Sequence, residues 1–386
     1  MKIVYCVDQL YHTGGIEKMV VQKANWLSRR DDFEVFIIAS SALQNPFFPL
    51  SSKVQFINLD IPYYSDIRLP RFFRLIWAFL LRDRHRKKLR ITLNNISPDV
   101  VIVTDRASML FVSIMSLSSR PLRVFEMHLS RDYYVKTYHS CTKKALARLG
   151  RVRENISFHG YDRIVVLSEE ESQKYDTDNP KIRIIPNFVY DNLPKASSLD
   201  SKVVITGGRL VKEKGFSSMV SAFRRVSAVF PDWQLHIYGE GPEKETLFSL
   251  IAELGLEGKV CLKGLVNDFP SMMRGASVFC ITSISEAFSL VTLEAISAGL
   301  PVVAFDIEGG LRDMVKDGIN GFLVPYNNEF LLAEKLIFLL GDSECRLLMG
   351  QQSRRIAEQF TADKIMPQWI ELFYERATDQ CRSIDI

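Results

Sequence analysis

The stretch SVFCITSISEAFSLVTLEAISAGLPVVAFD, residues 277–306, decides the fold class. An apolar run typical of a strand, SVFCIT (277–282), leads through a polar loop into a helical pattern that ends near Ala298 and Gly299. A second apolar run, PVVAFD (301–306), follows at once. Continuous apolar runs of this kind suit parallel strands that are buried on both faces. The stretch therefore predicts a strand, a helix and a parallel strand of an α/β fold.

The same alternation of strand and helix patterns continues in both directions along the chain. Further strands are predicted at 2–8, 33–40, 54–59, 99–104, 122–128, 163–168, 202–208, 233–239, 259–264 and 321–325, with helices near 17–30 and 216–229 among them. Residues 185–202 carry two prolines and several Ser, Asn and Asp, which predicts a linker. We therefore expect two α/β domains, 1–190 and 191–365, with a cleft between them. Ligands of such sheets bind beyond the carboxyl ends of the strands.

Composition excludes several classes of protein. Of the 386 residues 47% are hydrophobic and 24% are charged, which are ordinary globular values. No apolar run approaches the roughly 18–20 residues that a membrane-spanning helix needs. The N-terminus reads as a strand and not as a signal peptide. The six cysteines are widely spaced without a C-x-x-C motif, so we expect neither a zinc site nor a disulfide framework, and a cytoplasmic location.

The modest net charge of +4 conceals an uneven distribution. Residues 1–190 hold 29 Lys and Arg against 19 Asp and Glu, whereas the remainder is acidic. Much of the excess lies in RLPRFFRLIWAFLLRDRHRKKLR (68–90), where nine basic residues alternate with aromatic and aliphatic ones. This composition favours a helix on an anionic membrane surface. An amphipathic helix with an apolar core face and a solvated basic face remains the alternative. No nucleic-acid motif accompanies the patch.

Two segments of the second half carry chemistry suited to an anionic sugar ligand. GGRLVKEKG (207–215) joins a predicted strand to a helix, where Arg209 can fork onto phosphate oxygens and Lys214 adds a point charge. Glu286 precedes the next predicted helix and Glu294 lies within it. Carboxylates accept hydrogen bonds from sugar hydroxyls, and an acid on an otherwise apolar helix needs a partner. Solvated side chains are the alternative for each of these residues.

Other loops support the same interpretation. The amides of Ser289, Leu290 and Val291 would be free donors to phosphate at a helix N-terminus. Gly239 ends a predicted strand and suits a close backbone approach to a nucleotide, unless it is a plain turn. Val266 follows a third predicted strand, in a loop that could place main-chain groups against a base edge. Gly14 and Gly15 are further candidate ligand-binding residues. They follow the first predicted strand but do not complete a G-x-G-x-x-G dinucleotide fingerprint.

Together these residues resemble the retaining family 4 glycosyltransferases of the GT-B fold, in which two Rossmann-like domains face each other across a cleft. The resemblance covers nearly the whole chain and is strongest over 203–325. Its motifs are GGIE (14–17), GRLVKEKG (208–215), IYGEGP (237–242), SEAFSLVTLEAISAGLPVVA (285–304) and NGFLVP (320–325). Such enzymes transfer a sugar from a nucleotide-sugar, with retention of configuration and without a bound metal or other cofactor.

The resemblance assigns roles to single residues. It implies that Arg209 and Lys214 hold the diphosphate, that Glu286 contacts the donor sugar and that Glu294 contacts the ribose. His128 of the EMH motif matches a family histidine near the donor sugar, although a histidine satisfied at a strand end is the alternative. The implied substrate-binding set is Gly14, Gly15, Gly239, Val266, Phe288, Ser289, Leu290, Val291 and Glu294. Ala287 and Ser289 replace two family glycines, which leaves the donor sugar open.

The resemblance also implies partners. The first domain would bind a polyprenyl diphosphate-linked or glycan acceptor, with 68–90 against the inner face of the membrane, and a C-terminal helix over 366–386 would cross back to this domain. A UDP-sugar is the expected donor. The single D-x-D, Asp176 to Asp178, is interpreted as a turn and not a metal site. The alternatives are a nucleotide-sugar 2-epimerase of the same architecture and a non-catalytic partner subunit.

Overall fold

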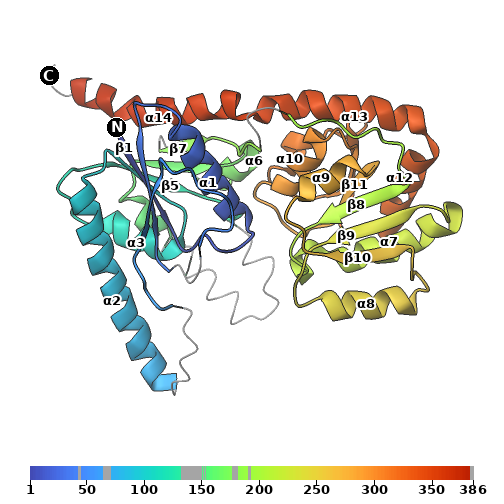
Figure 1. The fold of residues 1–386 in the computed structure, drawn as a ribbon, viewed down its shortest axis with the longest axis horizontal. Coiled ribbons are helices and arrows are strands. Elements are labelled where there is room, and N and C mark those ends of the chain that lie inside the picture. Colours follow the sequence, from blue (N-terminus) through green and yellow to red (C-terminus); the bar gives the residue numbers. More distant parts are fainter. Residues whose placement is uncertain are drawn as a thin grey trace.

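The computed structural model describes residues 1–41, 45–63, 71–131, 150, 152, 154–175, 181–189 and 193–382. The D-x-D motif, the start of the basic stretch at Arg68 and the predicted domain boundary at 190/191 lie outside these residues. Within them the chain forms two α/β lobes, each built on one parallel sheet, as Figure 1 shows. The predicted α/β class is confirmed.

The N-terminal lobe is a seven-stranded parallel sheet in the order β3-β2-β1-β4-β5-β6-β7. Its strands are β1 (Lys2–Val7), β2 (Glu34–Ala39), β3 (Gln55–Asn58), β4 (Val100–Val103), β5 (Leu122–Glu126), β6 (Arg163–Val166) and β7 (Ile182–Ile184). Its helices include α1 (Gly15–Leu27), α2 (Arg71–Ile96), α3 (Arg106–Ile114) and α6 (Glu169–Ser172). Successive strand residues point to opposite faces, so Ile3 and Tyr5 pack toward α1 whereas Val4 and Cys6 pack toward α2 and α3.

The C-terminal lobe has a six-stranded parallel sheet in the order β10-β9-β8-β11-β12-β13 around a single core. Its strands are β8 (Val203–Gly207), β9 (Gln234–Tyr238), β10 (Val260–Gly264), β11 (Val278–Ile281), β12 (Val302–Asp306) and β13 (Gly321–Pro325). The helices are η1 (Lys212–Lys214), α7 (Phe216–Val229), α8 (Lys244–Glu253), α9 (Phe269–Arg274), α10 (Leu290–Ser297), α11 (Leu311–Met314), α12 (Glu329–Gly341), α13 (Ser343–Ala357) and η2 (Glu358–Phe360). Helix α7 begins and ends where the sequence predicts.

The last helix, α14 (Ala362–Arg382), leaves the C-terminal lobe and packs on the N-terminal one, as Figure 1 shows along the upper edge. Trp369 is fully buried in the N-terminal core, on the face that also holds α1. Glu375 accepts a hydrogen bond from Arg183 of β7 at 2.9 Å and pairs with Arg163 of β6. The helix begins at Ala362, four residues before the predicted start, directly after Thr361, whose extended backbone ends η2.

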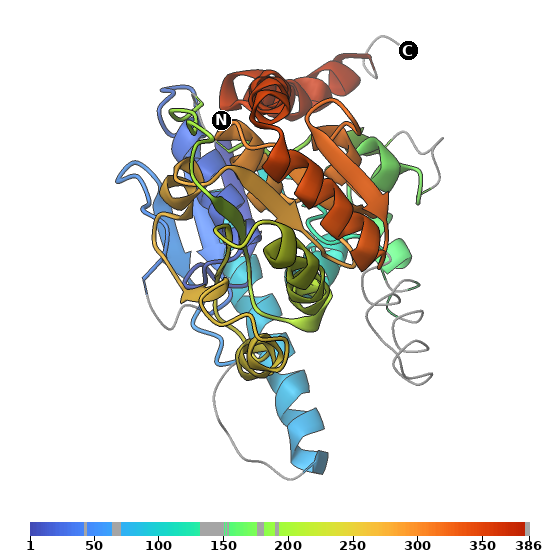
Figure 2. The ribbon, with the colours of Figure 1, turned by 90° about the vertical axis from the view of Figure 1, so that its right-hand side faces the viewer.

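Helix α2 holds the basic stretch and extends well beyond the sheet, as Figures 1 and 2 both show. One of its faces is buried through Leu81, His85 and Leu89, at the i, i+4, i+8 spacing of a packed helix. The opposite face exposes apolar side chains, including Phe79 at 72% and Leu80 at 53%. The helix therefore combines a core face with an uncovered apolar surface. No helix among the described residues is long and apolar enough to cross a membrane.

The structure differs from the sequence prediction in one further strand. Strand β7 is missing from the prediction, because three residues at a sheet edge give too short an apolar pattern. The predicted linker has no helix or strand where it is described, and it is partly packed: Ile185 and Phe188 are buried in the N-terminal core and Val189 against the other lobe, whereas residues 195, 196 and 198 are exposed.

Because His85 is buried and neutral, we predict an acid-sensitive fold. Ser40 Oγ lies 3.1 Å from its Nε2 and Tyr63 Oη 2.9 Å from its Nδ1, and burial lowers its pKa to about 4. The unfolded chain binds a proton near pH 6.5, so stability falls as pH drops from there toward 4. The free energy of unfolding should be measured by chemical denaturation for wild type and for His85→Gln. The difference between the two, wild type minus variant, should be about 2 kcal/mol smaller at pH 5 than at pH 7. A constant difference would contradict the prediction.

Candidate active site

The loops that leave the carboxyl ends of the C-terminal strands pack tightly against one another. Gly239, with φ at 137°, brings the loop after β9 so close to the loop after β8 that a Cβ atom would lie 1.9 Å from Gly208 O. Gly239 N also donates to Gly264 O at 2.8 Å, which draws in the loop that carries Val266. Only glycine fits this position. Three loops predicted to face the nucleotide are thus adjacent.

The structure brings two of the predicted donor-binding residues into direct contact. Lys214 Nζ donates to Glu286 Oε1 at 2.6 Å, and Ser283 Oγ donates to the same oxygen at 2.7 Å. The lysine and glutamate side chains are partly covered, at 29% and 12% exposed. Two hydrogen bonds to one carboxylate oxygen, one of them from a cation, fix the carboxylate in place. The pair therefore places a cation and a carboxylate, a group that can accept hydrogen bonds from hydroxyls, at the same point.

Arg209 differs from Lys214 in its surroundings. Its side chain is exposed, and none of the described residues hydrogen-bonds to it or pairs with it. It stands one residue beyond Gly208, in the same loop as Lys214. An uncommitted guanidinium has its full hydrogen-bonding capacity for a phosphate.

Helix α10 begins at the boundary between the lobes. Ser289 is its N-cap and accepts from Thr292 N–H, which leaves the N–H groups of Leu290 and Val291 without an acceptor among the described residues. These two donors, with the helix dipole, suit an anion. Phe288 is only 7% exposed and packs on Phe360, so its ring belongs to the core and only its main chain is available to a ligand.

The lobes meet directly around α10. Glu294, predicted for the ribose, is 7% exposed and forms an ion pair with Lys18 of α1 in the opposite lobe. Gly15 packs under Leu290, where a Cβ atom would lie 3.0 Å from its Cδ1. Gly15, one of the two glycines predicted to bind substrate, thus allows the start of α1 to lie close to α10. Lys18 is the partner that Glu294, an acid on an apolar helix, requires. We call this region, where both lobes contribute side chains, the interlobe boundary.

His128 lies two residues beyond β5, in the N-terminal lobe, beside a buried ion pair. Its Nε2 is 3.1 Å from Glu126 Oε1, and Glu126 also pairs with Lys23; the last two side chains are fully buried. Burial alone would raise the pKa of Glu126, but the charges of Lys23 and His128 hold it below its usual range. The Lys23 ammonium lies 4.3 Å from the ring centre of Trp369 in α14. The C-terminal helix thus covers the charge cluster behind His128.

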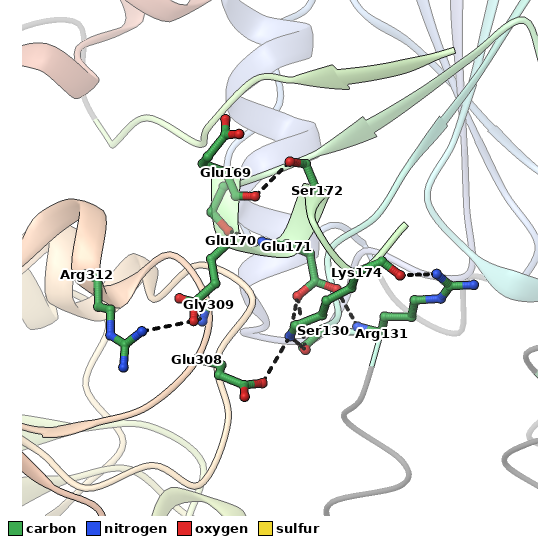
Figure 3. A network of polar contacts seen from close by, with 11 residues as sticks. Ser130, Arg131, Glu169, Glu170, Glu171, Ser172, Lys174, Glu308, Gly309 and Arg312 are labelled. Atoms are coloured by element: carbon green, nitrogen blue, oxygen red, sulfur yellow. Dashed lines mark hydrogen bonds and ion pairs between the residues drawn. The ribbon is translucent and has the colours of Figure 1, made fainter. Parts of the chain in front are cut away.

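Sequence reasoning missed Lys18, Lys23 and Glu126. Glu126 ends an apolar strand, and such an acid signals a buried partner, but which lysine supplies it depends on how α1 lies on the sheet. A second group is shown in Figure 3, where α6 joins residues that follow His128 to the loop after β12. Nothing in the sequence distinguishes its glutamates from ordinary solvated charges.

Two pockets lie near the predicted donor-binding loops of the C-terminal lobe. A cavity of about 290 Å³, lined by Lys212, Ser217, Tyr326 and others, includes none of the four predicted charged donor-binding residues. A smaller pocket between the ends of β8 and β11 is lined by Lys214, Ser283 and Val291 among others. Within the described part of the chain, no three His, Cys, Asp or Glu side chains cluster as metal ligands would.

Family models match both halves of the chain. Residues 13–192 match the model described as Glycosyltransferase Family 4, and residues 191–356 match Glycosyl transferases group 1. An uncharacterized glycosyltransferase of Haemophilus influenzae is 29% identical over 95% of this chain and 98% of its own length. A poly(ribitol-phosphate) alpha-N-acetylglucosaminyltransferase of Staphylococcus aureus is 30% identical, over 54% of this chain and 43% of its own.

Solved structures share the fold. A mutant of TarM from S. aureus, crystallised with Fondaparinux, alpha-GlcNAc-glycerol and UDP, superimposes with a TM-score of 0.79 at 17% identity, over 96% of this chain and 99% of its own. Sucrose-phosphate synthase of Thermosynechococcus elongatus gives 0.82 at 19% identity, over 98% and 100%. HepE of Anabaena, solved with UDP, gives 0.72 at 20% identity, over 96% and 99%. These likenesses confirm the predicted GT-B fold.

We predict that Lys18 and Glu294 are energetically coupled. Lys18→Met leaves a nearly buried carboxylate without its cation and should destabilise the protein by roughly 1–3 kcal/mol. Glu294→Gln in the same chain should recover part of that loss, because the unpaired charge is gone. Unfolding free energies of the two single variants and the double variant measure the coupling, with Lys263→Met, an exposed lysine of β10, as the control. Strictly additive losses would contradict a coupled pair.

Proposed function

The chain belongs to the family 4 glycosyltransferases of the GT-B fold, and from that premise we propose that it moves a sugar from a UDP-sugar to a glycan or lipid-linked acceptor with retention of configuration. The observation that carries the proposal is the convergence of Lys214, Glu286 and the start of α10 at the interlobe boundary. This arrangement offers positive charge and free amides beside a carboxylate suited to sugar hydroxyls.

The chemistry requires stabilisation of a leaving group. As the bond between the anomeric carbon and the diphosphate oxygen breaks, negative charge grows on the diphosphate. Arg209, Lys214 and the amides of α10 would stabilise that charge without reorganising, which is usually the largest catalytic contribution. The acceptor oxygen forms the new bond on the same face, and its proton passes to the leaving phosphate oxygen. We propose no metal, because these groups supply the required positive charge.

A uridine nucleotide is the proposed donor, because several similar proteins were solved with UDP or are named for a UDP-sugar. TarM and HepE were solved with UDP, and three relatives from streptococci are named as UDP-N-acetylglucosamine transferases. In this chain Gly239 and Val266 would approach the base, and Glu294 would accept from the ribose hydroxyls. Glu286 would accept from the sugar, with Ala287 and Ser289 shaping its pocket.

The acceptor would bind the N-terminal lobe. Relatives named for poly(ribitol-phosphate) and poly(glycerol-phosphate) substrates indicate that such phosphate polymers are one class of acceptor among similar proteins. The exposed apolar and basic side chains of α2 suit contact with an anionic bilayer, where a lipid-linked acceptor would be found. We therefore propose peripheral association with the inner face of the membrane.

The two alternatives to transferase activity have less support. A 2-epimerase needs no acceptor surface such as α2, and incubation with UDP-GlcNAc followed by detection of ManNAc would reveal one. A non-catalytic subunit has no need of the paired Lys214 and Glu286. Both of these residues, together with Arg209 and Glu294, are present.

The first test removes the positive charge that should meet the diphosphate. Once thermal-shift screening of nucleotide-sugars has identified the donor, we expect Arg209→Ala with Lys214→Ala to lower kcat by about 10²–10³-fold or more, since each group stabilises the departing diphosphate. Steady-state kinetics with that donor provide the measurement.

Lys212→Ala is the matched control, because Lys212 lies in the same loop, is exposed and lines the separate cavity. Its kcat should stay within about twofold of wild type, because this side chain contacts no group proposed to meet the donor. Unchanged turnover in the double variant would refute the proposed role of the two cations.

The second test concerns the membrane. Reversal of charge at Arg82, Arg84, Arg86 and Lys87, all exposed on α2, should move the protein from vesicles containing anionic lipid into the soluble fraction in a sedimentation assay. Lys88 is left unchanged, because its Nζ donates to Leu59 O at 2.6 Å and holds a loop.

The control set carries the same change of charge on other surfaces of the molecule. It consists of Arg224, Lys263, Arg355 and Lys364, each exposed. Equal loss of vesicle binding in both sets would show a non-specific charge effect and exclude a dedicated role of α2.

A further inference from the structure

Helix α6 and the residues after it contact loops of both lobes (Figure 3). The segment 168–174 lies at the carboxyl end of β6, beside residues 130 and 131 that follow His128. From the other side it is met by residues 308–312, which follow β12. We call this set of contacts the α6 bridge.

Within the N-terminal lobe, the α6 bridge is held by a buried carboxylate. Glu171 is fully buried and accepts from Ser130 Oγ at 3.1 Å, from Arg131 N at 2.5 Å and from Lys174 Nζ at 2.9 Å. The two oxygens of a carboxylate have about four lone-pair sites, so three donors can be accepted at once. A buried charge with three donors fixes all of them in position. Residues 130 and 131, which follow His128, are thereby fixed to α6.

On the side that faces the C-terminal lobe, the α6 bridge is held by a second carboxylate, which lies at the interlobe boundary. Glu170 accepts from Gly309 N at 2.9 Å and from Arg312 Nη1 at 3.1 Å. Arg312 in turn forks onto Asp306 at 2.7 and 3.0 Å, at the end of β12. Lys174 Nζ lies 3.7 Å from Glu308 Oε2. The N-terminal lobe thus holds the main chain of the loop after β12, and not merely its side chains.

That loop supports the proposed donor-sugar carboxylate. Gly310 N donates to Ala287 O at 3.0 Å. Gly309, with φ at 120°, lies so close that a Cβ atom would be 1.8 Å from Glu286 O. Residues 309 and 310 therefore lie directly against the main chain of Glu286 and Ala287, and help to hold it in place. A continuous set of contacts runs from the loop of His128, through α6, to Glu286.

We propose that Glu170 is a positioning residue, which sets the placement of Glu286 relative to His128 across the bound donor sugar. This inference rests on the proposed glycosyl transfer. The Glu170–Arg312 ion pair is partly exposed, with Arg312 at 49% and Glu170 at 25%, and such pairs contribute little to stability. Its effect on geometry can be much larger, because a misplacement of about 1 Å at a reacting centre can cost about 10²-fold in rate.

The test compares two neighbouring glutamates of one helix. Glu170→Ala removes the acceptor of Gly309 N–H, whereas Glu169→Ala removes an exposed carboxylate that Figure 3 shows pointing away from the loop. We expect Glu170→Ala to lower kcat by about 10-fold or more with the Kd of UDP unchanged, because the proposed UDP contacts lie within the C-terminal lobe. Glu170→Gln keeps a carbonyl acceptor and should recover part of kcat. Glu169→Ala should match wild type.

Hydrogen exchange of the full-length protein gives a readout independent of activity. Amides of residues 308–310 should exchange faster in Glu170→Ala than in wild type or Glu169→Ala. If wild type transfers sugar and Glu170→Ala keeps both its kcat and its exchange rates, the bridge is refuted while the proposed function stands. If Glu170→Ala lost UDP affinity in parallel with kcat, the substitution would have damaged the C-terminal lobe generally, and the positioning role of Glu170 would also be refuted. If no nucleotide-sugar reacts with wild type, the proposed function fails, and exchange alone decides whether the bridge exists.

Discussion

A nearly buried carboxylate must have a partner, and this requirement organises the region where the lobes meet. Glu294 is paired with Lys18, Glu286 with Lys214, and Glu126 with Lys23. Each pair fixes an acid whose desolvation would otherwise be costly. The side chains that a donor would meet are therefore oriented by the protein itself, and electrostatic stabilisation of a leaving group depends on such preorganisation.

The two lobes are joined by more than the chain between them. Helix α14 places Trp369 over Lys23, so the C-terminal end of the chain covers the charge cluster behind His128. Helix α6 makes the reciprocal connection, from the N-terminal lobe to the loop after β12. Both connections end near residues that the resemblance places around the donor. The relative position of the lobes is thus set by the same contacts that set the geometry of the candidate site.

The polarity of the molecule accords with the proposed contact of α2 with a membrane surface. The C-terminal lobe holds the loops suited to a nucleotide, whereas the basic and exposed apolar side chains gather on α2 of the other lobe. A small soluble donor and a large or lipid-linked acceptor would then approach from different directions. The buried Leu81, His85 and Leu89 anchor the inner part of α2, which leaves its opposite face free for this role.

The sequence alone determined the α/β class, nearly every strand and the residue types at the candidate site, because buried parallel strands and glycine-rich turns leave strong local patterns. It also indicated that Glu294 needs a partner. It could not identify Lys18 as that partner, or reveal that Lys23, Glu126 and Trp369 meet, since these residues lie far apart in the chain. Strand β7 and the contacts of α6 were equally hidden. Such pairings depend on how helices and lobes pack, and only the tertiary structure decided them.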